Sequence, residues 1–132
     1  MSPLQRLLKV GQILAQRGFQ YQVAPEIIEI NFGAWEGSPW EQLANYEIED
    51  WCNNFAHFAP DDGESLHQLF DRVEGWLSVR AIEKNAEKQP TPILTVGHAD
   101  WINAAKIIAY RQDVPKVTSE WPRSINYKLS SV

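Results

Sequence analysis

A histidine stands at the junction between two segments of different character. His98 follows the apolar run 92–96, which is typical of a strand buried on both faces, and helical spacing begins at about Asp100. In α/β proteins, ligands bind where a strand ends and a helix begins, and the amides of the helix favour an anion. Position alone leaves a second interpretation equally open, in which the imidazole only bonds a neighbouring backbone group.

Two charged side chains have a similar double interpretation. Arg6 lies in the first turn of a predicted helix, where the helix dipole disfavours a cation, and a bound anion would relieve the conflict. Glu29 interrupts the apolar run 27–30, and apolar surroundings would raise the pKa of its carboxyl, as a general acid requires. In the alternative interpretation, the stem of Arg6 reaches solvent and Glu29 is a loop residue that points into water.

The remaining reactive side chains suggest no further chemistry. His67 lies on the polar side of the third predicted helix and His57 in a predicted loop, and the single cysteine, Cys52, has no partner histidine at a recognisable spacing. Neither a metal-ligand spacing nor a glycine-rich phosphate loop occurs in the sequence. We therefore expect no metal and no cofactor.

Composition narrows the classes of partner. The formal net charge is −5 and the 12 Lys and Arg residues are scattered, which argues against nucleic acid and against a membrane surface. The lone cysteine excludes an internal disulfide and suits a reducing compartment, and no apolar run reaches membrane-spanning length. Six Trp in 132 residues are many for one domain, and we assign them to a core and a cleft wall. These features predict a single cytoplasmic domain.

Local signals predict four helices. Ser2, Ser38 and Ser65 are each followed three residues later by Gln or Glu, the pattern of a capping box. The predicted helices run from residue 2 to about 17, from about 39 with a break near 46, from 65 onward, and from about 100 to 110.

Three segments are predicted to be strands. They cover residues 21–24, 92–96 and 125–129, and they alternate with the predicted helices along the chain. Alternation of this kind predicts an α/β sandwich. Three strands make a thin sheet for four helices, and its unpaired edges would favour a homo-oligomer.

Four segments, taken in order, resemble the histidine phosphatases of the phosphoglycerate mutase-like superfamily. They are SPLQR at 2–6, EINFGAWEG at 29–37, PDDGES at 60–65 and VGH at 96–98. The resemblance implies a three-layer α/β/α sandwich and one partial domain over residues 1–132. Within the superfamily, the segment 51–64 most resembles the α-ribazole phosphatases of cobalamin biosynthesis.

The resemblance also implies a role for each candidate residue in the hydrolysis of a small phosphomonoester. Arg6 matches the arginine that grips the phosphate, Glu29 the acid that protonates the leaving oxygen, and His98 the histidine that hydrogen-bonds the transferring phosphoryl group. In this family the phosphoryl group passes to another histidine, in an Arg-His-Gly motif, and no metal takes part. That motif does not occur in the sequence. We therefore expect an N-terminally truncated, C-terminal portion of the enzyme, inactive as it stands.

The residues after His98 depart from the family pattern. Small residues usually follow this histidine, whereas Asp100 lies two positions on. Asp100 can be a helix cap, but its carboxylate would also repel a phosphate dianion. The alternative function is therefore a degenerate, non-enzymatic protein that binds phosphate or a protein partner.

Overall fold

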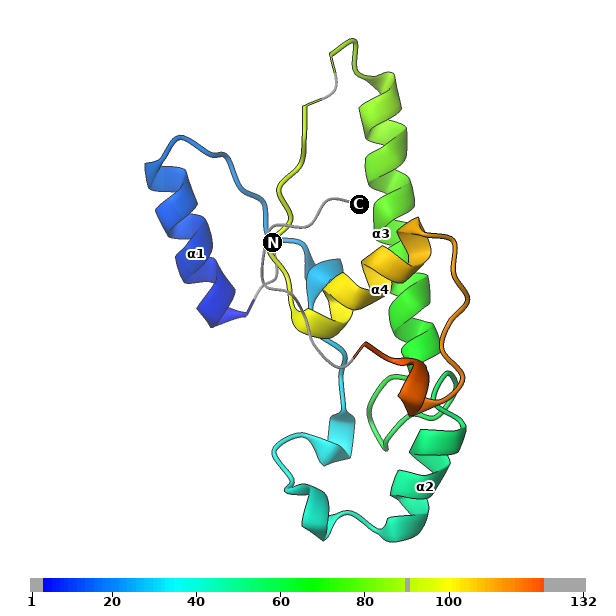
Figure 1. The fold of residues 1–132 in the computed structure, drawn as a ribbon. Coiled ribbons are helices and arrows are strands. Elements are labelled where there is room, and N and C mark those ends of the chain that lie inside the picture. Colours follow the sequence, from blue (N-terminus) through cyan, green and yellow to red (C-terminus); the bar gives the residue numbers. More distant parts are fainter. Residues whose placement is uncertain (1–3, 90, 123–132) are drawn as a thin grey trace.

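The computed structural model describes residues 4–89 and 91–122, and within these ranges its regular elements are all helical (Figure 1). The α-helices are α1 (Gln5–Gln16), α2 (Asn45–Asn53), α3 (Leu66–Ala86) and α4 (Ala99–Ala109). Four short 3-10 helices lie between and after them: η1 (Pro25–Ile27), η2 (Gly33–Trp35), η3 (Trp40–Gln42) and η4 (Thr118–Glu120).

The predicted α/β/α sandwich is wrong for this part of the chain. Residues 21–24 and 92–96 are extended but form no strand, and the third predicted strand, 125–129, lies outside the described residues. An apolar run becomes a strand only when a neighbouring strand pairs with its backbone, and the run itself cannot reveal that partner. Ile93 and Leu94 are 57% and 49% exposed, so this run is not covered as expected. The argument for a homo-oligomer through a sheet edge loses its basis here as well.

Helix α3 is the longest element and carries the core. Its capping box forms as predicted, with the Ser65 hydroxyl accepting from the Gln68 amide at 3.2 Å and Gln68 Oε1 accepting from the Ser65 amide at 2.8 Å. Leu69 and Val73 are fully buried against α4 and η1. Figure 1 shows α4 beside α3, with α1 to one side and α2 at the lower end. Helix α3 therefore provides the surface on which α4 is positioned.

The other helix predictions have mixed outcomes. Helix α1 ends before Gly18, whose φ of +90° makes it the expected stop, and α4 agrees with its predicted range. The segment after Pro39 divides into η3 and α2, and no side chain caps η3, so the capping box at Ser38 does not form. The proposed cap at Ser2 lies outside the described residues.

Candidate active site

Two of the candidate side chains meet at the N-terminus of α4. His98 is the N-cap residue of this helix and is only 6% exposed. Arg6, from the first turn of α1, donates a hydrogen bond from Nη2 to His98 Nδ1 at 3.0 Å, across 92 residues of sequence. Arg6, whose positive charge is unfavourable in the first turn of α1, thus contacts His98, the histidine predicted to bind the phosphoryl group.

This contact defines the state of the imidazole. A guanidinium can only donate, so Nδ1 must accept and the ring proton lies on Nε2. Burial lowers the pKa of His98 below its ordinary 6.5, and the positive charge of Arg6 lowers it further. His98 is therefore a neutral imidazole near pH 7.

Glu29 reaches the same helix end from the other side. Its Oε2 accepts from the Asp100 amide and its Oε1 from the Trp101 amide, both at 3.2 Å. Oε1 also accepts from the Ile30 amide at 3.1 Å. The half-buried carboxylate therefore occupies the anion site of α4, a polar setting instead of the apolar one expected from its sequence neighbours.

Asp100 lies in the first turn of α4 and does not act as its cap. Its Oδ1 accepts from Trp121 Nε1 at 3.2 Å. Burial raises the pKa of Asp100 and the negative charge of Glu29 raises it further, while the bond from Trp121 acts in the opposite direction. Two carboxyl groups thus share this helix end, and the surroundings of Asp100 favour its protonated form.

Sequence reasoning missed the residue that holds the Glu29 segment in place. Arg72, on α3, donates from Nη1 to the carbonyl oxygens of Glu26 and Ile28 at 2.8 and 2.7 Å. Its Nη2 binds Glu64 Oε1 at 2.6 Å. Arg72 therefore fixes the backbone just before Glu29. Its partners lie up to 46 residues away in sequence, so no local signal marks it.

A close backbone contact joins two of the motif segments. Gly33 has φ of +52°, and a Cβ there would lie 2.1 Å from the Asp61 carbonyl oxygen. The Ala34 amide donates to the same oxygen at 2.8 Å, and the Glu64 amide donates to the Asn31 carbonyl oxygen at 2.8 Å. Only glycine allows this approach, which packs segment 29–37 against segment 60–65 at the start of α3.

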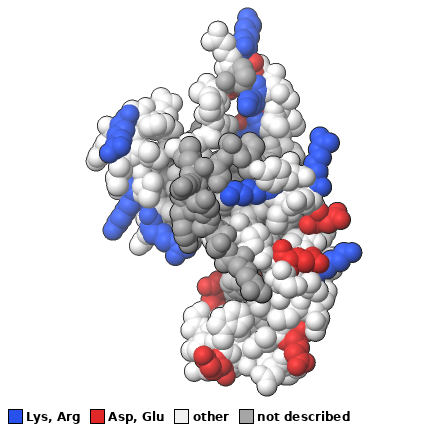
Figure 2. Space-filling view, in the orientation of Figure 1, with Lys and Arg blue, Asp and Glu red and all other residues white. Residues whose placement is uncertain are grey.

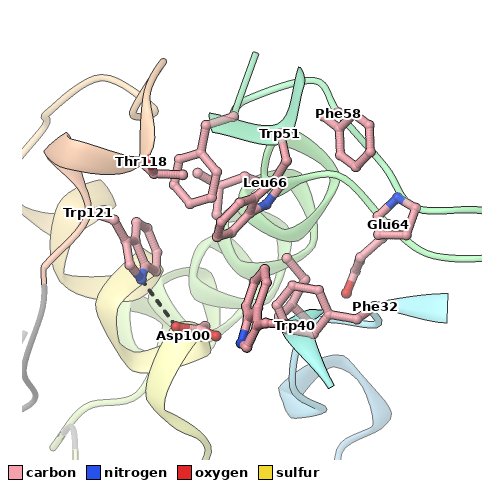
Figure 3. Close-up of a pocket in the computed structure, with 12 residues that line it drawn as sticks. Phe32, Trp40, Trp51, Phe58, Glu64, Leu66, Asp100, Thr118 and Trp121 are labelled. Carbon is pink, nitrogen blue, oxygen red and sulfur yellow. Dashed lines mark hydrogen bonds between the residues drawn. The ribbon is translucent and has the colours of Figure 1, made fainter. Parts of the chain in front are cut away.

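A cavity of about 230 Å³ adjoins the helix end (Figure 3). Its wall contains Asp100 and Glu64. Asp100 connects the cavity to Glu29, because the Asp100 backbone amide donates to the Glu29 carboxylate. Six aromatic side chains form most of the rest: Phe32, Trp40, Trp51, Phe55, Phe58 and Trp121. Figure 3 shows Trp40, Trp121 and Asp100 facing a common space, so the predicted cleft wall is present in part, while Trp101 lies in the core.

Charge is unevenly distributed around these features. On the face shown in Figure 2, basic side chains lie over α1 and the upper part of the molecule, and acidic ones gather over the lower part. Lys9 of α1 and Arg17, which follows this helix, are exposed, as are Glu49 and Asp50 of α2. Arg6 belongs to α1, on the basic side, whereas Glu64 and Asp100 of the cavity wall are acidic.

The other two histidines lie elsewhere, on a second, open pocket of the surface. The rings of His57 and His67 stack with centroids 5.2 Å apart, and His67 Nδ1 lies 3.3 Å from Asp71 Oδ2. Within residues 4–89 and 91–122, no group of three or more His, Cys, Asp or Glu side chains could hold a metal ion. Across the same ranges, no helix has the length and apolar character needed to cross a membrane.

Comparison with known proteins confirms the resemblance. Residues 1–120 match the histidine phosphatase superfamily (branch 1). The chain is 32% identical over 69 residues to the adenosylcobalamin/α-ribazole phosphatase of Escherichia coli K12, a match covering 50% of the chain and 34% of that protein. The chain therefore aligns with about a third of this relative.

Two solved structures share the fold. One is a mycobacterial glucosyl-3-phosphoglycerate phosphatase in complex with inorganic phosphate (TM-score 0.71, 23% identity), and the other is a mycobacterial hydrolase (TM-score 0.70, 24% identity). Each likeness covers 86% of this chain and 58% of the solved one. The family match over residues 1–120 establishes that the chain belongs to the histidine phosphatase superfamily, branch 1.

Proposed function

We propose that the chain supplies the phosphate-binding and acid residues of a phosphatase that acts on small phosphomonoesters through a phosphohistidine. The observation that carries the proposal is the meeting of Arg6, Glu29 and His98 at the N-terminus of α4, from three distant parts of the sequence. Arginine, imidazole N–H groups and helix amides are groups that bind phosphoryl oxygens.

Arg6 and His98 would bind the phosphoryl oxygens as hydrogen-bond donors. Arg6 lies at the exposed side of the site and can turn its planar guanidinium from His98 to two phosphoryl oxygens. His98 can donate from Nε2 to a third oxygen. Once a phosphate anion lies beside it, the lowering effect of Arg6 is offset and the imidazole gains affinity for a second proton.

Glu29 has the role of proton donor to the leaving group. Glu29 first takes up a proton from solvent. The bond from phosphorus to the ester oxygen then breaks as a bond from phosphorus to an imidazole nitrogen forms, and this proton passes from Glu29 to the departing oxygen. Water then attacks the phosphoryl group and releases phosphate and the free histidine. For this step the carboxyl must first exchange its bonds to the Asp100 and Trp101 amides for one to the substrate.

On this proposal, the 132 residues do not supply the nucleophilic histidine. None of the three histidines belongs to an Arg-His-Gly triplet. His98 is held by Arg6, and the ring of His57 stacks on that of His67 in the second pocket. We therefore expect the 132-residue chain to bind phosphate without hydrolysing its esters.

The narrower substrate proposal is α-ribazole 5′-phosphate. The likeness to the E. coli phosphatase supports it, because 32% identity extends over half of the chain. An assay of the chain extended by a segment with an Arg-His-Gly histidine, with α-ribazole 5′-phosphate and 3-phosphoglycerate as substrates, separates this substrate from the wider class.

A second candidate function is phosphate or partner binding without catalysis. It is favoured by the way Glu29 already occupies the amides of α4, so that an anion need only contact Arg6 and His98. In this case Glu29 is a structural cap and never a proton donor.

Two measurements test these proposals. Vanadate or phosphate at 100 times its dissociation constant should stabilise the folded chain by about 2.7 kcal/mol, and Arg6→Gln should abolish the effect. No shift in Tm at millimolar ligand would count against both candidates. Turnover of p-nitrophenyl phosphate by the 132-residue chain, lost on His98→Ala, would show that it needs no outside nucleophile. In a variant extended by a segment that carries an Arg-His-Gly histidine, turnover supports the enzyme and its absence supports the binding protein.

A further inference from the structure

The backbone just before Glu29 is bound by both core helices. Arg72 of α3 donates from Nη1 to the carbonyl oxygens of Glu26 and Ile28, at 2.8 and 2.7 Å. Trp101 of α4 donates from Nε1 to the same Glu26 oxygen at 2.8 Å. The chain that leads into Glu29 is therefore attached to α3 and to α4 at the same point.

Glu64 binds the backbone on the other side of Glu29. Its Oε1 accepts from the Asn31 amide at 3.0 Å, and its own amide donates to the Asn31 carbonyl oxygen at 2.8 Å. The same Oε1 accepts from Arg72 Nη2 at 2.6 Å, and the side chains of Arg72 and Glu64 are only 21% and 19% exposed. Hydrogen bonds between ionised groups are stronger than neutral ones. The Arg72–Glu64 pair therefore holds the chain both before and after Glu29.

The pair holds the backbone of Glu29 but leaves its side chain free to move. The Glu29 carboxylate is bound to the amides of Asp100 and Trp101, and the proposed reaction requires it to leave them. The bonds of the Arg72–Glu64 pair go to backbone groups of neighbouring residues and to each other, not to this carboxylate. They can therefore persist while the carboxyl group moves between rotamers of its own side chain.

We propose that Arg72 and Glu64 are positioning residues for proton transfer by Glu29. They fix its backbone, so that the carboxyl group leaves the α4 amides for the departing oxygen without a displacement of the chain. A misplacement of reacting groups by about 1 Å can lower a rate by about 100-fold. The role in proton transfer rests on the proposed function, whereas the positioning of the Glu29 carboxylate at α4 does not.

A double-mutant cycle tests the positioning in the 132-residue chain. Glu29→Ala is introduced into the wild type and into Arg72→Gln, and urea denaturation gives the free energy of unfolding of all four proteins. If Arg72 positions Glu29, the loss caused by Glu29→Ala should shrink in Arg72→Gln to less than about half of its value in the wild type, because residues that act together are not additive. Equal losses would refute the positioning.

Two further variants serve as the control and as the alternative. Arg80→Gln changes another arginine of α3, which is paired with Glu83 on the same helix. The loss caused by Glu29→Ala should be the same in Arg80→Gln as in the wild type, and a reduction there as large as in Arg72→Gln would refute a specific role. Glu64→Gln keeps an acceptor oxygen but removes the charge that Arg72 binds, and it runs the same cycle if Arg72→Gln does not fold. An unchanged loss in Glu64→Gln would refute the role of Glu64.

The dependence on the leaving group tests the link to catalysis, in the chain extended by a segment with an Arg-His-Gly histidine. Benzyl phosphate needs a proton on its departing oxygen, whereas p-nitrophenolate leaves without one. Arg72→Lys keeps the charge but not the planar fork of donors. It should lower kcat at least about tenfold for benzyl phosphate and less than about threefold for p-nitrophenyl phosphate, with KM unchanged. Equal falls for both esters would show a purely structural role and refute the proposal.

Glu29→Gln in the same extended protein separates this proposal from the proposed function. A fall that is selective for benzyl phosphate in Glu29→Gln, but not in Arg72→Lys, would refute the positioning role alone. Equal falls for both esters in Glu29→Gln, or no turnover of either ester, would refute proton transfer by Glu29 and with it the catalytic half of this proposal. The double-mutant cycle then decides whether the Arg72–Glu64 pair positions the carboxylate at α4.

Discussion

Replacement of Glu29 by alanine tests whether its carboxylate holds the start of α4. The change removes the acceptor of three backbone amides, two of which belong to Asp100 and Trp101 in the first turn. Loss of a helix N-terminal acceptor costs about 0.5–2 kcal/mol, and loss of a negative charge at this end costs about 0.3–1 kcal/mol. Relief of the repulsion between Glu29 and Asp100 offsets part of this cost. We therefore expect Glu29→Ala to lower the free energy of unfolding by about 1–2 kcal/mol.

Urea denaturation followed by far-UV circular dichroism measures this loss at pH 7. Glu29→Gln keeps one amide oxygen as acceptor and should lose about half as much. The matched control is Glu74→Ala, an exposed glutamate of α3, which should change the free energy of unfolding by less than about 0.5 kcal/mol. If Glu29→Ala and Glu74→Ala are equally stable, Glu29 does not bind the α4 amides in solution and the reasoning fails.

Three further predictions concern the same region. The pKa of His98 in the folded chain lies below 6.5, so as pH falls the unfolded chain takes up this proton first. The free energy of unfolding should therefore fall as pH drops below about 6.5. Thermal denaturation from pH 8 to 5 should show a smaller fall for His98→Gln than for the wild type. The pKa of Asp100 is raised above 3.8, so Asp100→Asn should stabilise the protein at pH 7, and urea denaturation should show this gain shrinking as pH falls toward about 3.8; a constant difference would contradict the assignment. Gly33→Ala should cost at least about 2 kcal/mol in urea denaturation because its Cβ would meet the backbone, whereas Gly37→Ala, with φ of +72° but open space around it, should cost only about 1 kcal/mol; equal costs would show that the close approach is absent.

The features that sequence predicted well depend on neighbours in the chain. The start of α3 follows from the capping box of Ser65 and Gln68, and its buried face from the helical spacing of residues such as Leu69 and Val73. His98 was placed at a helix N-terminus for the same reason, because apolar spacing marks where α4 begins. Local signals of this kind are complete within about one or two turns of helix.

The features that sequence could not supply depend on distant partners. Residues 92–96 have the composition of a buried strand, yet Ile93 and Leu94 are exposed. Strand formation requires pairing with another segment, and the composition of the run does not reveal whether such a segment is present. Glu29 was expected in apolar surroundings, but two of the three amides that it binds are 71 and 72 residues away. The aromatic wall likewise combines residues from several loops, among them Trp40 and Trp121, and no local pattern indicates that they meet.

On our proposal, Arg6 and His98 together form a phosphate site. Nitrogen-15 NMR of the histidine rings during titration with inorganic phosphate tests it most directly. We expect a saturable shift of the His98 ring signals toward the protonated form, absent in Arg6→Gln, while the signals of His57 and His67 stay in place. A response confined to His57 and His67, or none at millimolar phosphate, would contradict it.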